Sequence, residues 1–328
     1  MREMLERQEN RMKTGGRPAY WPVSLLIVGC GLIGASLAMA WRQLHSDARI
    51  VGVDTNAQHR EQARGLAGAA GGWSEHRAGE APECAARLVF DDVLPSVPDE
   101  SFDVAVLAAP VEAVCRLLAT VGDRAEYVMD VCSVKEPVVD AAQRLGITER
   151  FAPTHPMAGA ASSGPLAARP DLFQGEAWLV VKGWPALTRI RPMLTALGAH
   201  IVEVPSAVEH DRAMAAVSHG VHLASLAVMT AYGRAVVDNE ANPQLWAHLT
   251  GPGFRDVTRL AASPPTFWVS TLLSNRAAVL AHLERIGGAL QEFAAALANA
   301  DAERLTGLLR AAQSDHEHWQ HWRRNTPE

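Results

Sequence analysis

Apolar and polar positions follow two different patterns along the chain, and the change falls near residue 206. Before it, short apolar runs rich in β-branched residues alternate with stretches of helical spacing, for example 35–45 and 111–121. The runs that predict strands are Val23–Val28, Arg49–Asp54, Asp103–Pro110, Tyr127–Asp130, Trp178–Lys182 and His200–Val204. Buried strands that alternate with helices predict a parallel sheet covered on both faces.

After residue 206 the strand pattern disappears. Ala, Leu, Val and Met recur at helical spacing over 207–237, 268–298 and 301–323, which predicts an almost entirely helical region. The expected organisation is therefore a polar tail at 1–22, an α/β domain at 23–205 and an all-α domain at 206–328.

Composition adds the following limits. The chain has 328 residues, of which 48% are apolar and 20% charged, so two domains with full cores are expected. Its net charge of −6 is spread over interspersed acids and bases, which argues against a basic nucleic-acid-binding face. No apolar run of membrane-spanning length and no signal peptide is recognised, so we expect a cytoplasmic protein without a membrane partner.

The cysteines and a histidine cluster near the end of the chain predict no metal site. The four cysteines are scattered and form no Cys-x-x-Cys pair, which fits a reducing compartment without disulfides or structural zinc. They are Cys30, Cys84, Cys115 and Cys132. We interpret the histidines within 316–321 as part of a solvated helix.

A glycine-rich segment, Gly-Cys-Gly-Leu-Ile-Gly (29–34), follows the first predicted strand and opens the first predicted helix. This spacing lets a backbone turn sharply and approach a pyrophosphate at a helix N-terminus, although a glycine turn without a ligand is the alternative. Asp54 ends the second strand, where a carboxylate accepts hydrogen bonds from ribose hydroxyls and repels a 2′-phosphate. The pattern predicts a Rossmann-type domain that binds NAD rather than NADP. The expected cofactor-binding residues are Gly29, Gly31, Leu32, Ile33, Gly34, Asp54, Ala109 and Pro110.

Two polar residues provide candidate chemistry. Ser133 follows a strand in Asp-Val-Cys-Ser-Val-Lys (130–135), and His155 lies in Thr-His-Pro-Met-Ala-Gly (154–159). A hydroxyl and an imidazole beside a nicotinamide indicate removal of a hydride from a carbon that bears an OH group. A helix cap for Ser133 and a buried loop position for His155 are the structural alternatives.

With these motifs the chain resembles the prephenate/arogenate dehydrogenase family, the enzymes of tyrosine biosynthesis. The resemblance runs from about Val23 to about Leu290, and the order and spacing of the motifs make it specific. The motifs are Gly-Cys-Gly-Leu-Ile-Gly-Ala-Ser (29–36), Asp-Val-Cys-Ser-Val-Lys (130–135), His-Pro-Met-Ala-Gly (155–159), Glu-His-Asp (209–211), Ser-His-x-x-His (218–222) and Gly-Phe-Arg-Asp-Val-Thr-Arg (253–259).

The resemblance implies roles in catalysis for two residues. His155 matches the histidine that hydrogen-bonds the 4-hydroxyl of the substrate ring, and Ser133 matches the serine that holds this histidine near the nicotinamide. Lys135 is expected to orient the loop rather than to react. Asp211 matches an acid near the domain junction, or caps a helix. The implied reaction is NAD-dependent oxidative decarboxylation of prephenate or arogenate, in a homodimer whose helical domains interlock.

The resemblance also implies a substrate pocket. Arg259 matches the arginine that binds a substrate carboxylate, and Asp256 is expected to steer it. His222, Ser218 and Trp268 match pocket positions, with packing inside helices or the core as the alternative for each.

The sequence departs from the family pattern at two places. Ser218-His-Gly-Val-His222 carries Val221 where the family has proline, which predicts a straighter helix. Ala161 stands where the family often has an acid, so a 4-amino-4-deoxyprephenate dehydrogenase is an alternative. A hydroxyacid dehydrogenase or imine reductase, and a non-catalytic NAD-binding sensor, are further alternatives.

Overall fold

The computed structural model describes most of the chain as two units. The described residues are 21–67, 87–160, 162–240 and 242–325. The expected tail up to residue 20, Cys84 and Ala161 lie outside them. The sheet unit comprises the chain up to Asp211 together with Thr266–Ser274, and the helical unit comprises Arg212–Pro265 and the chain from Asn275 onward. The expected α/β region followed by an all-α region is confirmed.

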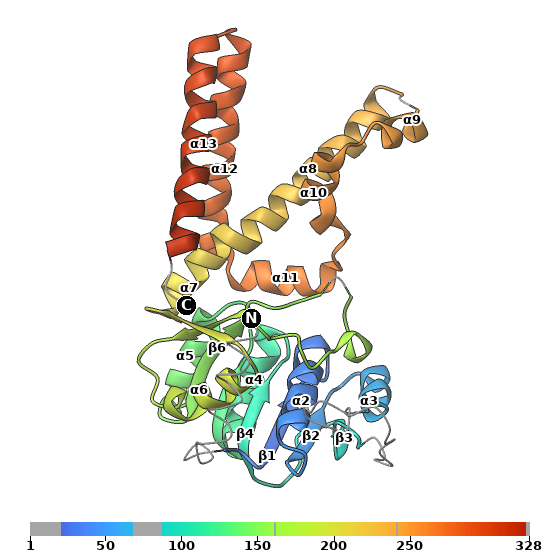
Figure 1. Cartoon of the computed structure of the whole chain (residues 1–328), viewed down its shortest axis with the longest axis vertical. Helices are drawn as coiled ribbons and strands as arrows, with labels where there is room; N and C mark the ends of the chain where they lie inside the picture. Colours follow the sequence, from blue (N-terminus) through green and yellow to red (C-terminus); the bar gives the residue numbers. More distant parts are fainter. Residues whose placement is uncertain (1–20, 68–86, 161, 241, 326–328) are drawn as a thin grey trace, which may run out of the picture. The chain divides into compact units, whose positions relative to one another are not determined.

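The sheet unit is built on eight strands in the order β3-β2-β1-β4-β5-β6-β7-β8 (Figure 1). All neighbouring strands are parallel except β6 and β7, which run antiparallel. The strands are β1 (Ser24–Val28), β2 (Arg49–Val53), β3 (Asp92–Leu94), β4 (Phe102–Leu107), β5 (Ala125–Asp130), β6 (Phe151–Pro156), β7 (Ala177–Val181) and β8 (His200–Val204). Six of them coincide with predicted runs, whereas β3 and β6 were not predicted.

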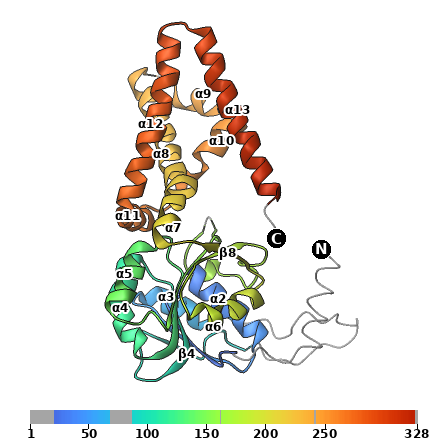
Figure 2. The same ribbon diagram turned by 90° about the vertical axis from the view of Figure 1, so that its left-hand side faces the viewer.

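Helices cover both faces of this sheet because its strands are apolar on both sides (Figure 2). On β1, Leu25 and Ile27 pack with one layer, and Leu26 and Val28 pack with the other. The first layer contains α2 (Leu32–Leu44), α3 (Ala57–Arg64) and α6 (Leu187–Ala196), and the second contains α4 (Val111–Gly122) and α5 (Glu136–Arg144). This arrangement places the ends of β1, β4 and β5 beside the starts of helices.

One helix from late in the sequence, α11 (Pro265–Ser274), belongs almost entirely to the sheet unit. Ser270 and Ser274 donate hydrogen bonds to the carboxylate of Glu112 in α4, at 2.6 and 3.3 Å. The expected continuous helix over 268–298 is therefore wrong. The chain leaves helical geometry at Asn275, and α12 (Arg276–Ala298) begins after it.

The two units divide after Asp211, later than the expected boundary at 205–206. Helix α7 (Ala207–Met214) begins close to that boundary, but its side chains at 210 and 211 hydrogen-bond residues of the sheet unit. Those contacts explain why the first turns of α7 belong with the sheet. The boundary at 205–206 remains a prediction from the sequence.

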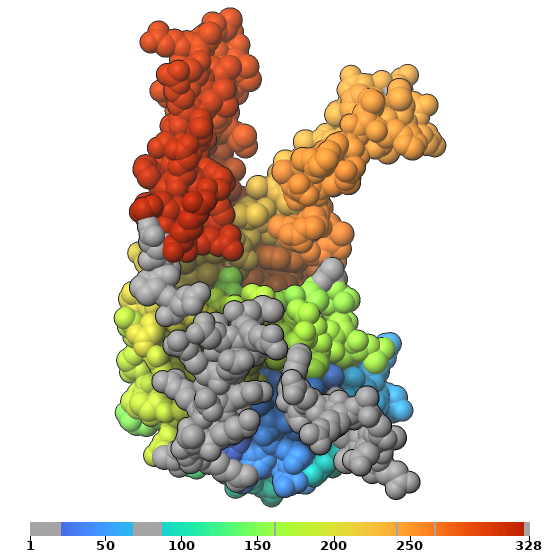
Figure 3. Space-filling model, in the orientation of Figure 1, coloured from blue at the N-terminus to red at the C-terminus, as the bar shows by residue number. Residues whose placement is uncertain are grey.

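The described residues of the helical unit contain helices and turns and no strand. After α7 come η2 (Ala215–His219), α8 (Gly220–Asp238), α9 (Pro243–His248), α10 (Pro252–Thr258), η3 (Arg259–Ala262), α12 and α13 (Ala302–Asn325). Helices α12 and α13 form an antiparallel hairpin whose two helices diverge away from the turn that joins them (Figure 2). Figure 3 shows the surface of this hairpin in red. Ala300 provides its turn with a positive φ of 51°.

Many large apolar side chains of the helical unit are exposed in the single chain. They include Val217, Val221, Val237, Leu249, Val257, Leu280, Leu290, Leu297, Leu309 and Trp322. Exposed apolar residues spread over several helices are typical of a surface that another protein chain covers.

One helix is long and apolar enough to cross a membrane, judged by length and composition only. In that respect the expectation that no apolar run reaches this length is wrong. Residues 207–238 form one continuous helix of 32 residues whose most apolar window has a mean hydropathy of 1.3 and is 33% buried. The same helix carries the buried polar residues His219, His222 and Ser225. Such residues are typical of a helix that packs within a protein.

Candidate active site

The glycine loop between β1 and α2 is shaped by close backbone approaches. Gly29 has a φ of 101°, and a Cβ atom there would lie 2.2 Å from the Ala108 carbonyl oxygen. A Cβ atom on Gly34 would lie 2.0 Å from the Gly29 carbonyl oxygen. Gly31 differs from both, because a Cβ atom there would meet nothing within 4 Å. Gly29 and Gly34 are therefore required for the turn, and Gly31 leaves open space at the start of α2.

Asp54, just after β2, lies beside this loop. Its Oδ2 accepts a hydrogen bond from the Cys30 amide at 3.0 Å, and its Oδ1 accepts one from the Asn56 amide at 2.8 Å. Arg60 donates at 2.9 Å to the carbonyl oxygens of Asp54 and Thr55, so its guanidinium is engaged by the backbone. Together with the uncapped N-terminus of α2, this arrangement fits a dinucleotide whose ribose hydroxyls bind a carboxylate.

A buried ion pair fixes the segment that follows β5. Lys135 and Asp130 are fully buried, and the Lys135 ammonium binds the Asp130 carboxylate and donates to the Thr154 carbonyl oxygen at 2.7 Å. The other Asp130 oxygen accepts from the Thr154 amide at 3.1 Å, and Trp178 donates to the Thr154 hydroxyl at 2.9 Å. Lys135 thus joins the loop that carries Ser133 to the strand that carries His155.

Ser133 is half-buried in this loop, and its hydroxyl lies 3.5 Å from that of Thr271 in α11. The amides of Lys135 and Glu136 at the start of α5 donate to Asp211, and the Ser133 hydroxyl meets Thr271 instead, so Ser133 does not cap this helix. Trp268 lies on the same helix as Thr271, where it is half-buried and packs edge-on against Phe267. The contact by which Ser133 would hold His155 stays a prediction.

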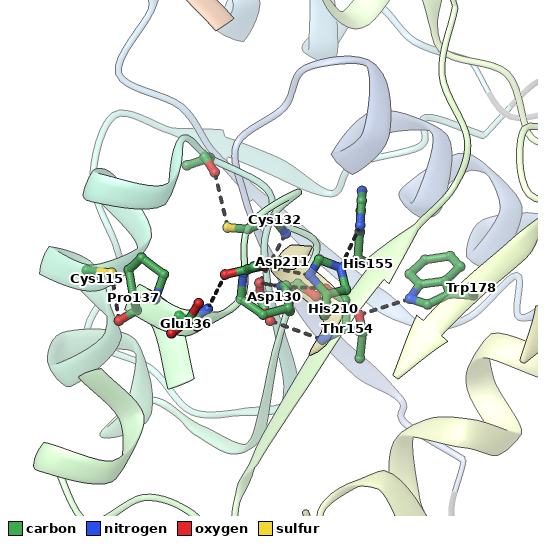
Figure 4. Close-up of polar contacts among 12 residues, drawn as sticks. Cys115, Asp130, Cys132, Glu136, Pro137, Thr154, His155, Trp178, His210 and Asp211 are labelled. Atoms are coloured by element: carbon green, nitrogen blue, oxygen red, sulfur yellow. Dashed lines mark hydrogen bonds and ion pairs between the residues drawn. The ribbon is translucent and has the colours of Figure 1, made fainter. Parts of the chain in front are cut away.

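His155 lies near the end of β6 and is half-buried. Its Nδ1 is 3.0 Å from Nε2 of His210, and Nδ1 of His210 is 2.7 Å from Oδ1 of Asp211 (Figure 4). The Asp211 carboxylate also accepts from the amides of Lys135 and Glu136, at 2.7 and 2.8 Å. Asp211 therefore caps the N-terminus of α5. The same carboxylate is one end of a hydrogen-bonded chain that runs through His210 to His155.

The substrate residues expected after 211, apart from Trp268, lie in the helical unit. Ser218 is half-buried in η2, His222 is buried in α8, and burial lowers the pKa of its imidazole. Asp256 lies near the C-terminal end of α10, and Arg259 is the first residue of η3. Both side chains are exposed. The predicted site residues therefore fall into two groups, one in the sheet unit and one in the helical unit.

The helix around Ser218 contains a widened turn that the argument from Val221 did not predict, and a straighter helix at this place stays a prediction. Residues Ala215–His219 form a π-helical segment, and His219 Nδ1 lies 3.1 Å from the Asn275 side-chain amide within the helical unit. A Cβ atom on Gly220 would lie 2.3 Å from the His282 ring. The close approach of α12 lies next to the widened turn, and such π-helical turns are frequent at functional sites.

Two buried cysteines of the sheet unit, Cys30 and Cys132, are unsuited to nucleophilic catalysis. Burial, followed by the nearby charge of Asp54, raises the pKa of Cys30 to about 12. Burial also raises the pKa of the Cys132 thiol well above its usual value, with Asp130 adding to the effect. Both thiols are therefore neutral at physiological pH.

Sequence reasoning missed the residues that support Ser133 and His155. Asp130 and Thr154 appeared only as members of motifs, and Thr271 was not named. No role was predicted for His210. The available signal was the Glu-His-Asp motif (209–211), which places an acid next to a histidine. Nothing in the sequence pairs that motif with β6, because the two are far apart along the chain.

Comparison with known proteins gives consistent matches over most of the chain. The family model for the prephenate dehydrogenase nucleotide-binding domain matches residues 74–203, and that for the prephenate dehydrogenase dimerization domain matches residues 206–311. A prephenate dehydrogenase of Bacillus subtilis is 29% identical over 301 residues, which cover 88% of this chain and 74% of the relative.

Two further relatives extend this result. A cyclohexadienyl dehydrogenase of Zymomonas mobilis is 26% identical over 299 residues, covering 88% of this chain and 93% of the relative. The structure of a prephenate dehydrogenase from A. aeolicus in complex with hydroxyphenyl propionate and NAD+ superimposes with a TM-score of 0.74. It is 23% identical and the match covers 92% of this chain and 99% of that one. The latter likeness supports the fold.

Proposed function

Because the chain belongs to the prephenate/arogenate dehydrogenase family, we propose that it catalyses the NAD-dependent oxidative decarboxylation of prephenate or arogenate. The products are 4-hydroxyphenylpyruvate or tyrosine, CO2 and NADH. The observation that carries the proposal is the position of His155, an imidazole at the end of β6 held by a hydrogen-bonded network in the same unit as the glycine loop. Bound NAD supplies the hydride acceptor.

The chain's own residues manage the proton and the geometry of this reaction. His155 accepts the proton of the ring 4-hydroxyl as the hydride leaves C4. The bond between C1 and its carboxylate breaks, its electron pair completes the aromatic ring, and His155 returns the proton to the phenolate oxygen. The gain in aromaticity drives the step, so the protein mainly has to position the reactants.

Prephenate carries two carboxylates, and we assign one of them to Arg259. A guanidinium binds a carboxylate through two parallel hydrogen bonds and keeps its charge at every physiological pH. Asp256 on the preceding helix is assigned to orient this arginine, and Ser218, His222 and Trp268 are assigned to the pocket wall. These assignments rest on the family motifs.

NADH formation by purified protein tests the proposal. Prephenate, arogenate and 4-amino-4-deoxyprephenate are offered separately with NAD, and binding of NAD is confirmed independently. We expect turnover of prephenate or arogenate. Turnover of the amino compound alone would replace this function with the specialised alternative, and NAD binding without turnover of any of the three would leave a non-catalytic sensor.

Replacing Arg259 with Ala is expected to raise KM for prephenate at least about tenfold, because a charge-assisted hydrogen bond contributes roughly 1.5–3 kcal/mol. The KM for NAD should stay within about twofold. Steady-state kinetics measure both constants, and Arg144→Ala, an exposed arginine at the end of α5, is the matched control. An unchanged KM for prephenate in R259A would argue against a carboxylate clamp.

Gly31→Ala is expected to preserve the fold and to weaken NAD binding about tenfold or more. Its new methyl group meets no protein atom within 4 Å, so it occupies the space through which a pyrophosphate approaches the backbone. Calorimetric titration with NAD and thermal unfolding separate the two effects. Gly287→Ala in α12, where a Cβ atom also meets nothing within 4 Å, should bind NAD normally. Equal affinity of G31A and wild type would contradict the assigned cofactor site.

We further assign the exposed apolar residues of the helical unit to the contact surface of a homodimer. Their distribution over α8, α10, α12 and α13 supports this, as does the match of residues 206–311 to a dimerization domain. Analytical ultracentrifugation tests it directly, with a dimer as the expected species. Cytoplasmic localisation stays a prediction.

A further inference from the structure

We propose that His210 and Asp211 are positioning residues that keep the proton of neutral His155 on Nδ1, so that Nε2 is the atom that accepts the substrate proton. The inference rests on the proposed function for its chemical consequence. It concerns a residue, His210, to which the motif comparison gave no role.

The Asp211 carboxylate can only accept hydrogen bonds. The amides of Lys135 and Glu136 at the N-terminus of α5 donate to its two oxygens at 2.7 and 2.8 Å. Oδ1 also lies 2.7 Å from Nδ1 of His210. His210 must therefore donate from Nδ1 in this contact.

His210 is neutral in this environment. It is completely buried, and burial lowers the pKa of its imidazole, with Lys135 acting in the same direction and Asp211 and Asp130 opposing it. A neutral imidazole carries one proton, which lies on Nδ1 because Asp211 requires a donor there. Nε2 of His210 is consequently an acceptor.

This acceptor fixes the state of His155. Nε2 of His210 lies 3.0 Å from Nδ1 of His155, so His155 donates from Nδ1 and its neutral ring is unprotonated at Nε2. When Nε2 takes a proton from the substrate, the resulting imidazolium keeps its hydrogen bond to His210, and the Asp211 charge lies behind that ring. Because His210 is 0% and Asp211 1% exposed, water does not compete for this chain of hydrogen bonds.

Two substitutions at His210 separate positioning from packing. His210→Leu removes the acceptor and is expected to lower kcat about 10²-fold, whereas His210→Gln presents an amide oxygen near the place of Nε2 and should retain kcat within about tenfold of wild type. The KM for substrate and the affinity for NAD should change less than about threefold in both. The acid limb of the pH profile of kcat/KM should move to lower pH in H210L, because the His155 imidazolium loses its acceptor. A kcat of H210L within threefold of wild type, or no advantage of H210Q over H210L, would overturn the proposal.

The tautomer is measured directly by ¹⁵N NMR of histidine-labelled protein, with the His155 signals identified by their loss in His155→Asn. Wild type should carry the neutral proton on Nδ1, and H210L should shift the population toward Nε2. Protonation on Nε2 in wild type would refute the positioning role even if the enzyme turns over prephenate. The expected tautomer in a protein without turnover would refute the proposed function and leave the positioning role intact.

Discussion

Asparagine in place of His155 is expected to lower kcat about 10³-fold, within the range that general base catalysis contributes. The amide nitrogen of Asn lies near the place of Nδ1, so the variant can still donate to Nε2 of His210. What it lacks is a basic nitrogen at the position of Nε2. Initial rates of NADH formation measure the loss, and calorimetric titration should give an NAD affinity close to that of wild type.

The matched control is His200→Asn, which changes an exposed histidine at the start of β8. Its kcat should stay within about twofold of wild type, since surface substitutions away from a site have small effects. If H155N retained the wild-type kcat while it still bound NAD, His155 would have no part in proton transfer.

Lys135→Met is expected to lower the free energy of unfolding by about 3–5 kcal/mol, because removal of one partner of a buried ion pair leaves the other charge uncompensated. Lys135 and Asp130 are both 0% exposed, and the ammonium also binds the Thr154 carbonyl oxygen at 2.7 Å. Urea denaturation followed by circular dichroism measures the change. Loss of activity should accompany it, because the same ammonium holds the Ser133 loop against β6.

The double variant Asp130→Asn with Lys135→Met should be more stable than K135M alone, since no unpaired charge remains buried. Lys182→Met is the exposed control: its ammonium lies 3.2 Å from Glu203, and the two side chains are 55% and 38% exposed. That change should cost less than about 1 kcal/mol. Equal effects of K135M and K182M would show that the buried pair does not stabilise the fold.

The sequence predicted the strands whose apolar runs are unbroken and missed those that differ from this pattern. Strand β6 contains Pro153 and Pro156, and proline argues against a strand inside a sheet. The structure accommodates them because β6 pairs with β5 on one side over only three residue pairs and with β7 on the other in the antiparallel sense. Strand β3 is three residues long, too short for a periodic signal.

The candidate residues were predictable where a local motif carried them. The glycine loop, Asp54 and the His155 segment each stand within a few residues of a strand end. The supporting residues were not predictable, since His210 meets His155 only because α7 packs against the sheet unit after the last strand. The π-helical segment at Ala215–His219 lies next to the close approach of α12 at Gly220, a long-range contact that a proline-based argument about Val221 does not include.

The attachment of α11 to the sheet unit has a consequence for dividing the protein. Cutting the chain once, after Asp211, would give a fragment with every strand but without the two hydroxyls that donate to Glu112 and without Thr271 beside Ser133. A nucleotide-binding module cut from this chain therefore requires the segment 266–274 as well. The sheet unit is a module in space that is assembled from two separate stretches of sequence.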